Sequence, residues 1–351
     1  MNIELIQEQL DKNRRSVAFD SYDITIKQLY DMLLEKMIDI APEYQRHFVW
    51  DIERQSALIE SLFLGIPVPS LFMASNKDAS WEVIDGLQRL TTIVNFIGSD
   101  DDFKKLGANF KKLKLNDLEK LDSMNGMTYD ALPKSMQFMF QTRPLRITVL
   151  NDRSDFNVRY DLFERLNTGG VSLHEQEIRN CVFIGEFNDF IKELANNQDF
   201  RAVVKMTDAA ERSGSYEELV LRFFAYYEDR EQFIHSVKEF LNNYMDKKTK
   251  SFKNKKELES IFNQTFKELK DILPDGIVRG TRKNITPIIL YEAISVGTAI
   301  ALGETTQLNH ASLTDLLNDK TLVKYTTGAT NSKKMVENRI EFVRDILIHA
   351  L

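Results

Sequence analysis

The segment Trp81–Thr92, W-E-V-I-D-G-L-Q-R-L-T-T, holds the side chains with the clearest chemical potential in this chain. A short apolar run precedes the Asp85-Gly86 turn, and apolar residues then recur at helical spacing. This order predicts a strand, a tight turn and a helix. A helix N-terminus presents unpaired backbone N–H groups and a partial positive charge, so the turn is expected to favour an anionic ligand.

The polar residues that follow the turn suit a phosphate group. Gln88, Arg89, Thr91 and Thr92 add an amide, a guanidinium and two hydroxyls to the first turns of the predicted helix. Arginine is well matched to phosphate because its planar fork donates two parallel hydrogen bonds. Asp85 is placed to hold a metal ion or to orient a water molecule.

A purely structural interpretation fits the same residues. Asp85 can cap the helix or form the turn, which contributes about 0.5–2 kcal/mol of stability. Arg89 can form an exposed ion pair worth about 0–1 kcal/mol, whereas a hydrogen bond to a desolvated charged group contributes about 1.5–3 kcal/mol. The two interpretations therefore predict different sensitivity to Arg89→Ala.

Two further polar clusters lie at predicted element boundaries. The segment P-E-Y-Q-R-H-F-V-W contains Gln45 and Arg46, and F-E-R-L-N-T-G-G contains Asn167. Gln45 and Arg46 can bind a ligand or brace the backbone beside an aromatic cluster. Asn167 can adopt the left-handed conformation that ends a helix, which is the simplest interpretation of that residue in isolation.

Several common catalytic arrangements are missing from the sequence. The chain has one cysteine and five scattered histidines, without an H-x-x-x-H pair or an Asp-His cluster that would indicate a zinc site or a histidine-metal nuclease. It also lacks a Walker-type phosphate loop and a G-x-S-x-G elbow. Conventional P-loop and hydrolase mechanisms are therefore not expected.

The charge balance limits how the chain can contact nucleic acid. Its formal net charge is −7, the opposite sign from that of a sequence-indifferent DNA coat. Any DNA contact is expected to use a local patch. The basic stretch 245–256 is one candidate, although a solvated loop between helices is the favoured interpretation.

The sequence carries no recognisable targeting or membrane segment. The first residues lack the basic and apolar regions of a secretory signal. No run approaches the roughly 18 apolar residues that a membrane span needs. We therefore expect a cytoplasmic protein without a membrane partner, in agreement with the low cysteine content.

The pattern of apolar residues predicts an α+β protein with two domains. The expected helices of the first domain, 1–171, are 26–37, 52–64, 133–141 and 155–166, with strands at 70–74, 81–84 and 146–150. Thr25 and Asp51 are predicted caps, Gly65 is a predicted stop, and 98–126 is expected to be an exposed polar excursion. The second domain, 172–351, is expected to be helical, with helices at 175–195, 216–227, 231–244, 256–273 and 287–302.

Four motifs occur in an order that resembles a known family. They are P-E-Y-Q-R-H-F-V-W, S-L-F-L-G-I-P-V-P, I-D-G-L-Q-R-L-T-T and F-E-R-L-N-T-G-G. Together they resemble the N-terminal domain family of GmrSD-type modification-dependent restriction endonucleases, over about residues 24–180. The resemblance implies a ParB/sulfiredoxin-like mixed α/β domain, followed by a mostly α-helical domain.

The resemblance also implies a role for each matching residue. It places a D-G-x-Q-R loop linked to NTP hydrolysis on Asp85, Gly86, Gln88 and Arg89. It places further nucleotide contacts on Gln45, Arg46 and Asn167. The implied cofactors are a nucleoside triphosphate and Mg²⁺, with Asp85 as the metal ligand.

Two departures from the family pattern limit the activity that the resemblance implies. Leu87 stands where the family often has glutamine, so one polar contact is lost. The His-Asn-His nuclease motif common in the C-terminal part of the family does not occur in this sequence. A separate nuclease subunit is therefore an expected partner, together with nucleotide, DNA and further copies of the chain.

Our leading hypothesis is an Mg²⁺-dependent NTP hydrolase of an anti-phage or restriction system directed at foreign or modified DNA. Arg46 and Arg89 would hold phosphates, Gln45 and Gln88 would position them or the attacking water, and Asp85 would bind Mg²⁺. One alternative is a non-enzymatic switch in which nucleotide controls DNA or partner binding. Another is a DNA nickase that acts through the ParB-like domain itself.

Overall fold

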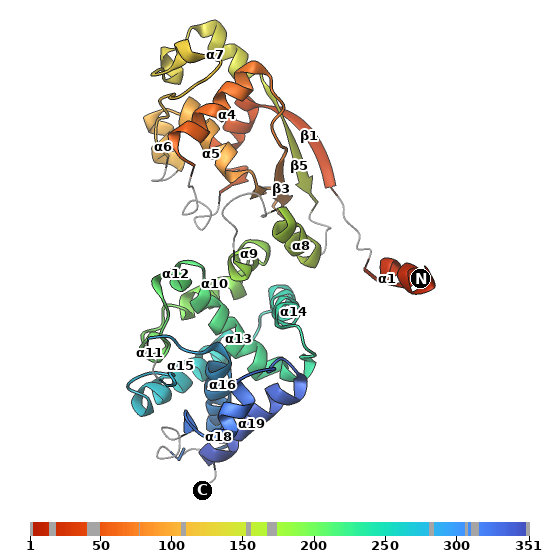
Figure 1. Ribbon diagram of the computed structural model, residues 1–351, viewed down its shortest axis with the longest axis vertical. Helices are drawn as coiled ribbons and strands as arrows, with labels where there is room; N and C mark the ends of the chain where they lie inside the picture. Colours follow the sequence, from red (N-terminus) through yellow and green to blue (C-terminus); the bar gives the residue numbers. More distant parts are fainter. Residues whose placement is uncertain are drawn as a thin grey trace. The chain divides into compact units, whose positions relative to one another are not determined.

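The chain forms two compact units, Met1–Ser172 and Leu173–Leu351 (Figure 1). The computed structural model describes residues 3–13, 19–40, 50–76, 78–106, 110–151, 156–166, 174–280, 284–305, 308–309 and 316–348. The first unit combines helices with a sheet, and the second is helical in its described residues. The fold class is therefore α+β, as the sequence predicts.

A mixed five-stranded sheet organises the first unit, in the order β1-β5-β3-β4-β2. Neighbours β1 and β5, and β3 and β4, run antiparallel, whereas β3 and β5, and β2 and β4, run parallel. β1 and β2 are the two edge strands. The strands are β1 (Phe19–Thr25), β2 (Ile38–Asp39), β3 (Leu71–Ser75), β4 (Trp81–Asp85) and β5 (Pro144–Leu150).

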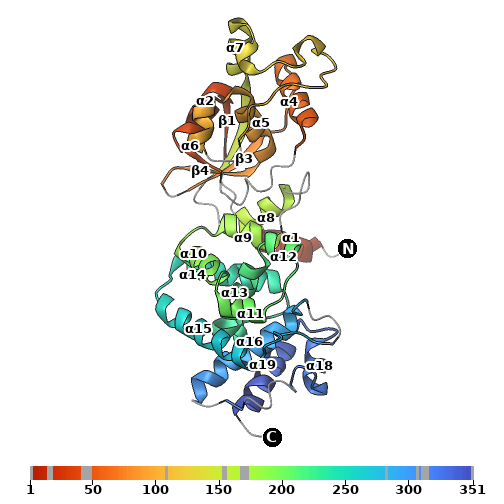
Figure 2. The ribbon, with the colours of Figure 1, turned by 90° about the vertical axis from the view of Figure 1, so that its left-hand side faces the viewer.

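Helices cover the sheet (Figure 2). Aromatic side chains join several of these helices. Phe63 of α4, Phe96 of α5 and Phe140 of α7 pack together with Tyr129. This cluster fixes α5, the helix that follows the Asp-Gly turn. The helices of this unit are α1 (Ile3–Asn13), α2 (Ile26–Leu34), α4 (Ile52–Leu64), α5 (Leu87–Ile97), α6 (Asp100–Leu106), α7 (Lys134–Gln141) and α8 (Phe156–Leu166), with short 3₁₀ turns η1 (Asp122–Met124) and η2 (Tyr129–Ala131).

The local signals in the first unit are largely confirmed. The Thr25 hydroxyl accepts a hydrogen bond from the Gln28 N–H, and the Asp51 carboxylate accepts one from the Arg54 N–H. Gly65 ends α4 in the left-handed conformation at φ 74°. The expected strands and the helix after the Asp-Gly turn are also present. Each of these features depends on residues close in sequence.

Three expectations for the first unit are wrong or incomplete. α2 ends at Leu34 rather than at residue 37, because Lys36 adopts a positive φ of 59°. The stretch 98–126 contains α6 and buries Leu113, Leu115 and Leu118, so its described part is not a simple exposed excursion. β1 was not expected, because F-D-S-Y-D-I-T has too few apolar residues to indicate a strand.

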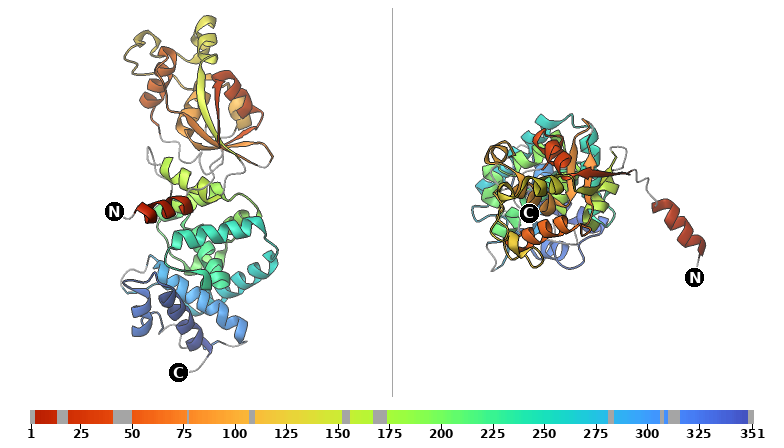
Figure 3. Two further views of the ribbon diagram at one scale, coloured as in Figure 1. Left: turned by 90° about the vertical axis from the view of Figure 1, so that its right-hand side faces the viewer. Right: turned by 90° about the horizontal axis from the view of Figure 1, so that it is seen from above.

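The second unit is built around long helices that pack along one another. α16 packs against α13, α15 and α19, and α16 and α19 run side by side (Figures 1 and 3). The described helices are α9 (Glu175–Val182), α10 (Glu186–Leu194), α11 (Gln198–Val203), α12 (Asp208–Arg212), α13 (Ser215–Asp229), α14 (Val237–Lys250), α15 (Lys255–Ile272), α16 (Ile288–Glu304), α18 (Lys320–Thr326) and α19 (Lys333–Ile348), with the turn η4 (Arg230–Gln232).

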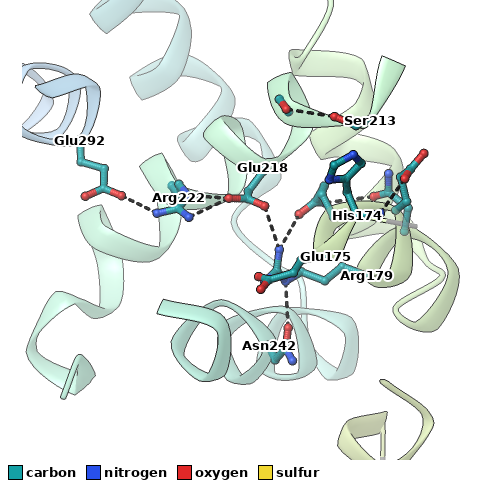
Figure 4. A network of polar contacts seen from close by, with 12 residues as sticks. His174, Glu175, Arg179, Ser213, Glu218, Arg222, Asn242 and Glu292 are labelled. Carbon is teal, nitrogen blue, oxygen red and sulfur yellow. Dashed lines mark hydrogen bonds and ion pairs between the residues drawn. The ribbon is translucent and has the colours of Figure 1, made fainter. Parts of the chain in front are cut away.

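Alternating charges link four of these helices in the interior. Arg179 of α9 bonds to Glu218 of α13 at 3.2 Å, and Arg222 of α13 bonds to both Glu218 and Glu292 at 2.7 Å (Figure 4). Glu292 of α16 also bonds to Arg339 of α19 at 2.5 Å. The side chains of Arg179, Glu292 and Arg339 are fully buried. We give the name buried ion-pair chain to the five linked residues Arg179, Glu218, Arg222, Glu292 and Arg339.

Two helix expectations in this unit need correction. The predicted helix 175–195 is divided into α9 and α10, with a break at Phe183–Gly185. The predicted helix 231–244 begins later, at Val237, because the Ser236 hydroxyl caps α14 there. The 3₁₀ turn η4 occupies the region where the helix was expected to start.

The basic stretch 245–256 is not the solvated loop that the sequence suggested. It comprises the last turns of α14, a short connection and the start of α15. Lys248 is buried and pairs with Glu228 at 2.6 Å, while Lys247 pairs with Asp229 and Lys250 with Asp246. Much of its positive charge is therefore paired with acidic side chains of the same unit, although Lys247 and Lys250 are exposed. Among the described helices, none is long and apolar enough to cross a membrane.

Candidate functional site

The Asp-Gly turn joins the end of β4 to the start of α5. Gly86 has φ 103° and ψ 12°, a left-handed conformation that favours glycine. A Cβ atom there would lie 2.3 Å from Leu71 Cδ2, so the turn needs glycine for space as well. No side chain caps α5, which leaves its first N–H groups as candidate donors to an anion.

Asp85 and Arg89 form an ion pair across this turn. Arg89 Nη2 lies 2.7 Å from Asp85 Oδ2, and Arg89 Nη1 donates to the carbonyl oxygens of Pro69 at 2.6 Å and Ser70 at 3.3 Å. The guanidinium therefore ties the turn to the segment before β3. The Arg89 side chain is 12% exposed and the Asp85 side chain 36%. Asp85 thus presents a fixed, partly exposed carboxylate beside the N-terminus of α5.

Gln88 connects this turn to the end of the polar segment P-E-Y-Q-R-H-F-V-W. Its Oε1 atom accepts a hydrogen bond from the Trp50 N–H at 3.2 Å. On the other side, Gln55 Nε2 donates to the Trp50 carbonyl at 3.0 Å, and Asn95 Nδ2 donates to Gln55 Oε1. Trp50 is the last residue of the segment P-E-Y-Q-R-H-F-V-W, which contains Gln45 and Arg46. The end of that segment is therefore held against the start of α5.

Gln55 and Asn95 are supporting residues that the sequence did not reveal. Both side chains are buried, on α4 and α5 respectively. Each bonds to a group that is distant in the chain, and sequence spacing gives no sign of such a pair. Arg159 of α8 is a similar case, because its Nη2 atom donates to the Ser75 carbonyl at the end of β3 at 2.8 Å.

The remaining predicted residues fall into two groups. Thr91 and Thr92 lie on α5 but are buried, and the Thr92 hydroxyl donates to the Gln88 carbonyl at 2.7 Å. Gln45, Arg46 and Asn167 lie outside the described residues. The structure thus brings Asp85, Gly86, Gln88 and Arg89 together.

The donor set at the turn is compatible with one hard cation. Among the described residues, no group of three or more His, Cys, Asp or Glu side chains is arranged to hold a metal ion. Mg²⁺ does not need such a group, because it is commonly bound by one or two carboxylates together with substrate phosphates and water. The partly exposed Asp85 carboxylate fits that mode of binding. The described residues do not form a metal site whose ligands all come from the protein.

Comparison with protein families places this turn in context. Residues 26–184 match the family model described as GmrSD restriction endonuclease, N-terminal domain. This segment is therefore similar to the GmrSD N-terminal domain family. The match confirms the resemblance predicted from the four motifs, and it connects the chain with restriction systems. It also includes α9, which lies within the second compact unit.

Two other comparisons add little to this assignment. No curated protein matches the chain. Among solved structures, a Pnob8-like ParB-N domain is similar at 14% sequence identity, with 95% of each chain covered and a TM-score of 0.23. A TM-score of this size supports no conclusion about fold or function, so the assignment depends on the family match.

Proposed function

We propose that the GmrSD N-terminal domain of this chain binds a nucleoside triphosphate with Mg²⁺ and hydrolyses it. The activity would serve a restriction system directed at foreign or modified DNA. The observation that carries the proposal is the Asp85 carboxylate, which Arg89 holds beside the uncapped N-terminus of α5. A carboxylate for Mg²⁺ and backbone N–H groups for phosphate are thereby adjacent.

Each residue of the turn has a distinct role in this proposal. Asp85 would hold Mg²⁺ or orient the attacking water, and the first N–H groups of α5 would bind phosphate oxygens. Arg89 would act as a positioning residue, because its terminal nitrogens already bond to Asp85, Pro69 and Ser70. Gln88 would fix the adjoining Trp50 segment. When bound, Mg²⁺ would neutralise charge on the phosphates.

The proposal gives up two predicted ligands and retains three others. Thr91 and Thr92 are assigned to the packing of α5, since both are buried and the Thr92 hydroxyl bonds to its own helix. Gln45, Arg46 and Asn167 stay in the proposal on the basis of the motif resemblance alone.

Nucleotide turnover by the full chain tests this proposal. We expect Mg²⁺-dependent release of phosphate from the wild type and a loss of at least about 100-fold in Asp85→Asn, as for removal of an important acid–base or electrostatic group. Arg89→Lys should retain partial activity. Asp101→Asn is a matched control, because Asp101 is a highly exposed carboxylate that pairs with Lys104 in the same unit. Absence of turnover in the wild type, or equal turnover in Asp85→Asn, would refute hydrolysis.

One observation favours a second candidate, a nucleotide-dependent switch without hydrolysis. The family match extends into α9, where Arg179 is fully buried and bonds to Asn242 of α14 and Glu218 of α13. The family match therefore ends inside the helical unit, and the first helix of that unit belongs to the matched segment. Tight nucleotide binding without turnover, together with nucleotide-dependent DNA binding, would favour the switch over the hydrolase.

A further inference from the structure

The edge strand β1 offers backbone groups to a binding partner. β1 lies at one end of the strand order, and its inner neighbour β5 pairs with it along all seven residues (Figure 1). Among the described residues, no other strand pairs with β1, and residues 19–23 are exposed. An open edge of this kind presents N–H and C=O groups that an extended peptide can use.

A groove of about 710 Å³ lies directly beside this edge. Residues 21–24 of β1 form one side, α2 forms the other, and Met37 and Trp81 complete it. The rings of Tyr22 and Trp81 are stacked, with centroids 5.5 Å apart. Tyr22 is 41% exposed and Met37 46%, so a ligand can reach this apolar surface.

The charge of the groove selects a cationic ligand. The carboxylates on its α2 side are those of Asp31 and Glu35, whereas the Asp23 side chain alternates with Tyr22 and lies on the opposite face of β1. Asp31 pairs with Lys27, but both side chains are at least 42% exposed. Exposed pairs of this type contribute only about 0–1 kcal/mol, so a ligand cation can compete for the carboxylates. In the described part of the chain, the Glu35 carboxylate has no ion-pair partner.

The position of Tyr22 relates the groove to the strand edge. Side chains alternate along a strand, so Tyr22 and the buried Ile24 share one face. A residue opposite Tyr22 on an added strand would have its Cβ atom about 4.5–5.5 Å from that of Tyr22. A long cationic side chain at this position would enter the groove. Arginine fits best, because its planar guanidinium stacks on aromatic rings and binds carboxylates with two hydrogen bonds.

We propose that the outer edge of β1 binds an extended, arginine-containing segment of a partner protein and accepts one arginine into the groove between β1 and α2. The segment adds a strand to the sheet. Backbone hydrogen bonds supply affinity, while the Tyr22–Trp81 stack and the acidic residues supply selectivity. The acidic lining disfavours a nucleic-acid phosphate, and Asp85 is not among the residues that line the groove.

Synthetic peptides binding to the full chain test this inference. The probe is a fluorescein-labelled nine-residue peptide of alternating threonine and valine with a central arginine, compared with the same peptide carrying glutamate at that position. We expect the arginine peptide to bind, and the double variant Asp31→Asn/Glu35→Gln to weaken it at least about tenfold. Glu53→Gln is the matched control, because Glu53 is an exposed residue of α4 outside the groove.

Two further measurements separate strand addition from general charge attraction. N-methylation of alternate peptide residues should abolish binding in one frame and be tolerated in the other, because one set of N–H groups faces β1. Binding should also quench the fluorescence of Trp81. Equal binding of both peptides, equal affinity of the double variant, or no binding at 1 mM peptide would overturn the proposal. Concentration-dependent dimerisation that Tyr22→Asp abolishes would assign the edge to a second copy instead, and would also overturn it.

Discussion

Two regions of this molecule use arginine–carboxylate pairs in different environments. At the turn after β4, Asp85 and Arg89 are one helical turn apart and partly exposed. In the helical unit, the buried ion-pair chain joins residues far apart in sequence, and Glu292 and Arg339 are both fully buried. The chemistry of the side chains is the same. Burial and sequence separation are what differ.

This difference indicates which pair is structural and which is available for function. Removing one partner of a buried pair leaves an uncompensated charge and costs about 3–5 kcal/mol. An exposed pair contributes much less, about 0–1 kcal/mol. At the turn, a ligand can reach the partly exposed Asp85 carboxylate while Arg89 keeps its bonds to Pro69 and Ser70. In the buried ion-pair chain, Glu292 and Arg339 are fully buried and out of a ligand's reach.

The largest effect is expected when the buried ion-pair chain is broken. Arg339→Met removes one of the two cationic partners of the fully buried Glu292 and the donor to the Thr330 carbonyl, and should lower the free energy of unfolding by about 3–5 kcal/mol. Urea denaturation measures this change. Lys104→Met removes one partner of a highly exposed pair with Asp101 and is the control. If Arg339→Met lowers the free energy of unfolding by less than about 1 kcal/mol, the buried ion-pair chain is no more important for stability than an exposed pair.

A smaller loss of stability is expected at the turn itself. Gly86→Ala places a side chain at φ 103° and within 2.3 Å of Leu71, and backbone strain of this type costs about 1–3 kcal/mol. The control is Gly303→Ala, since Gly303 lies in α16 with open space around it. Equal unfolding free energies for the two variants would contradict the assigned geometry of the turn.

The pH dependence of stability should follow the buried ion-pair chain. Burial favours the neutral form of Glu218, but Arg222 and Arg179 outweigh it and lower the pKa of this carboxyl below its ordinary value of 4.5. A lowered pKa in the folded state means that Glu218 adds stability above pH 4.5, and that this contribution is lost as the pH falls further. Urea titrations between pH 3 and pH 7 should show this loss. Glu218→Gln should have a flatter profile below pH 4.5, and an unchanged profile would contradict the assignment.

The same contrast explains what the sequence could predict. Thr25, Asp51, Gly65 and the Asp-Gly turn were correctly assigned because each acts on backbone groups within a few residues. The partners of Arg179, Gln55 and Asn95 lie on other elements, so only the folded chain brings them together. β1 was missed for a related reason, since it is an edge strand with mostly exposed residues and therefore lacks an apolar pattern.

Nucleotide-induced stabilisation of wild type and Asp85→Asn tests the central claim most directly. With Mg²⁺ and a nucleoside triphosphate at about 100 times its dissociation constant, the wild type should gain roughly 2.7 kcal/mol in unfolding free energy. Asp85→Asn should stay within about 1 kcal/mol of the wild type without nucleotide, and should lose most of that gain. An equal gain in both proteins, or none in the wild type, would show that the Asp85 turn is not the nucleotide site.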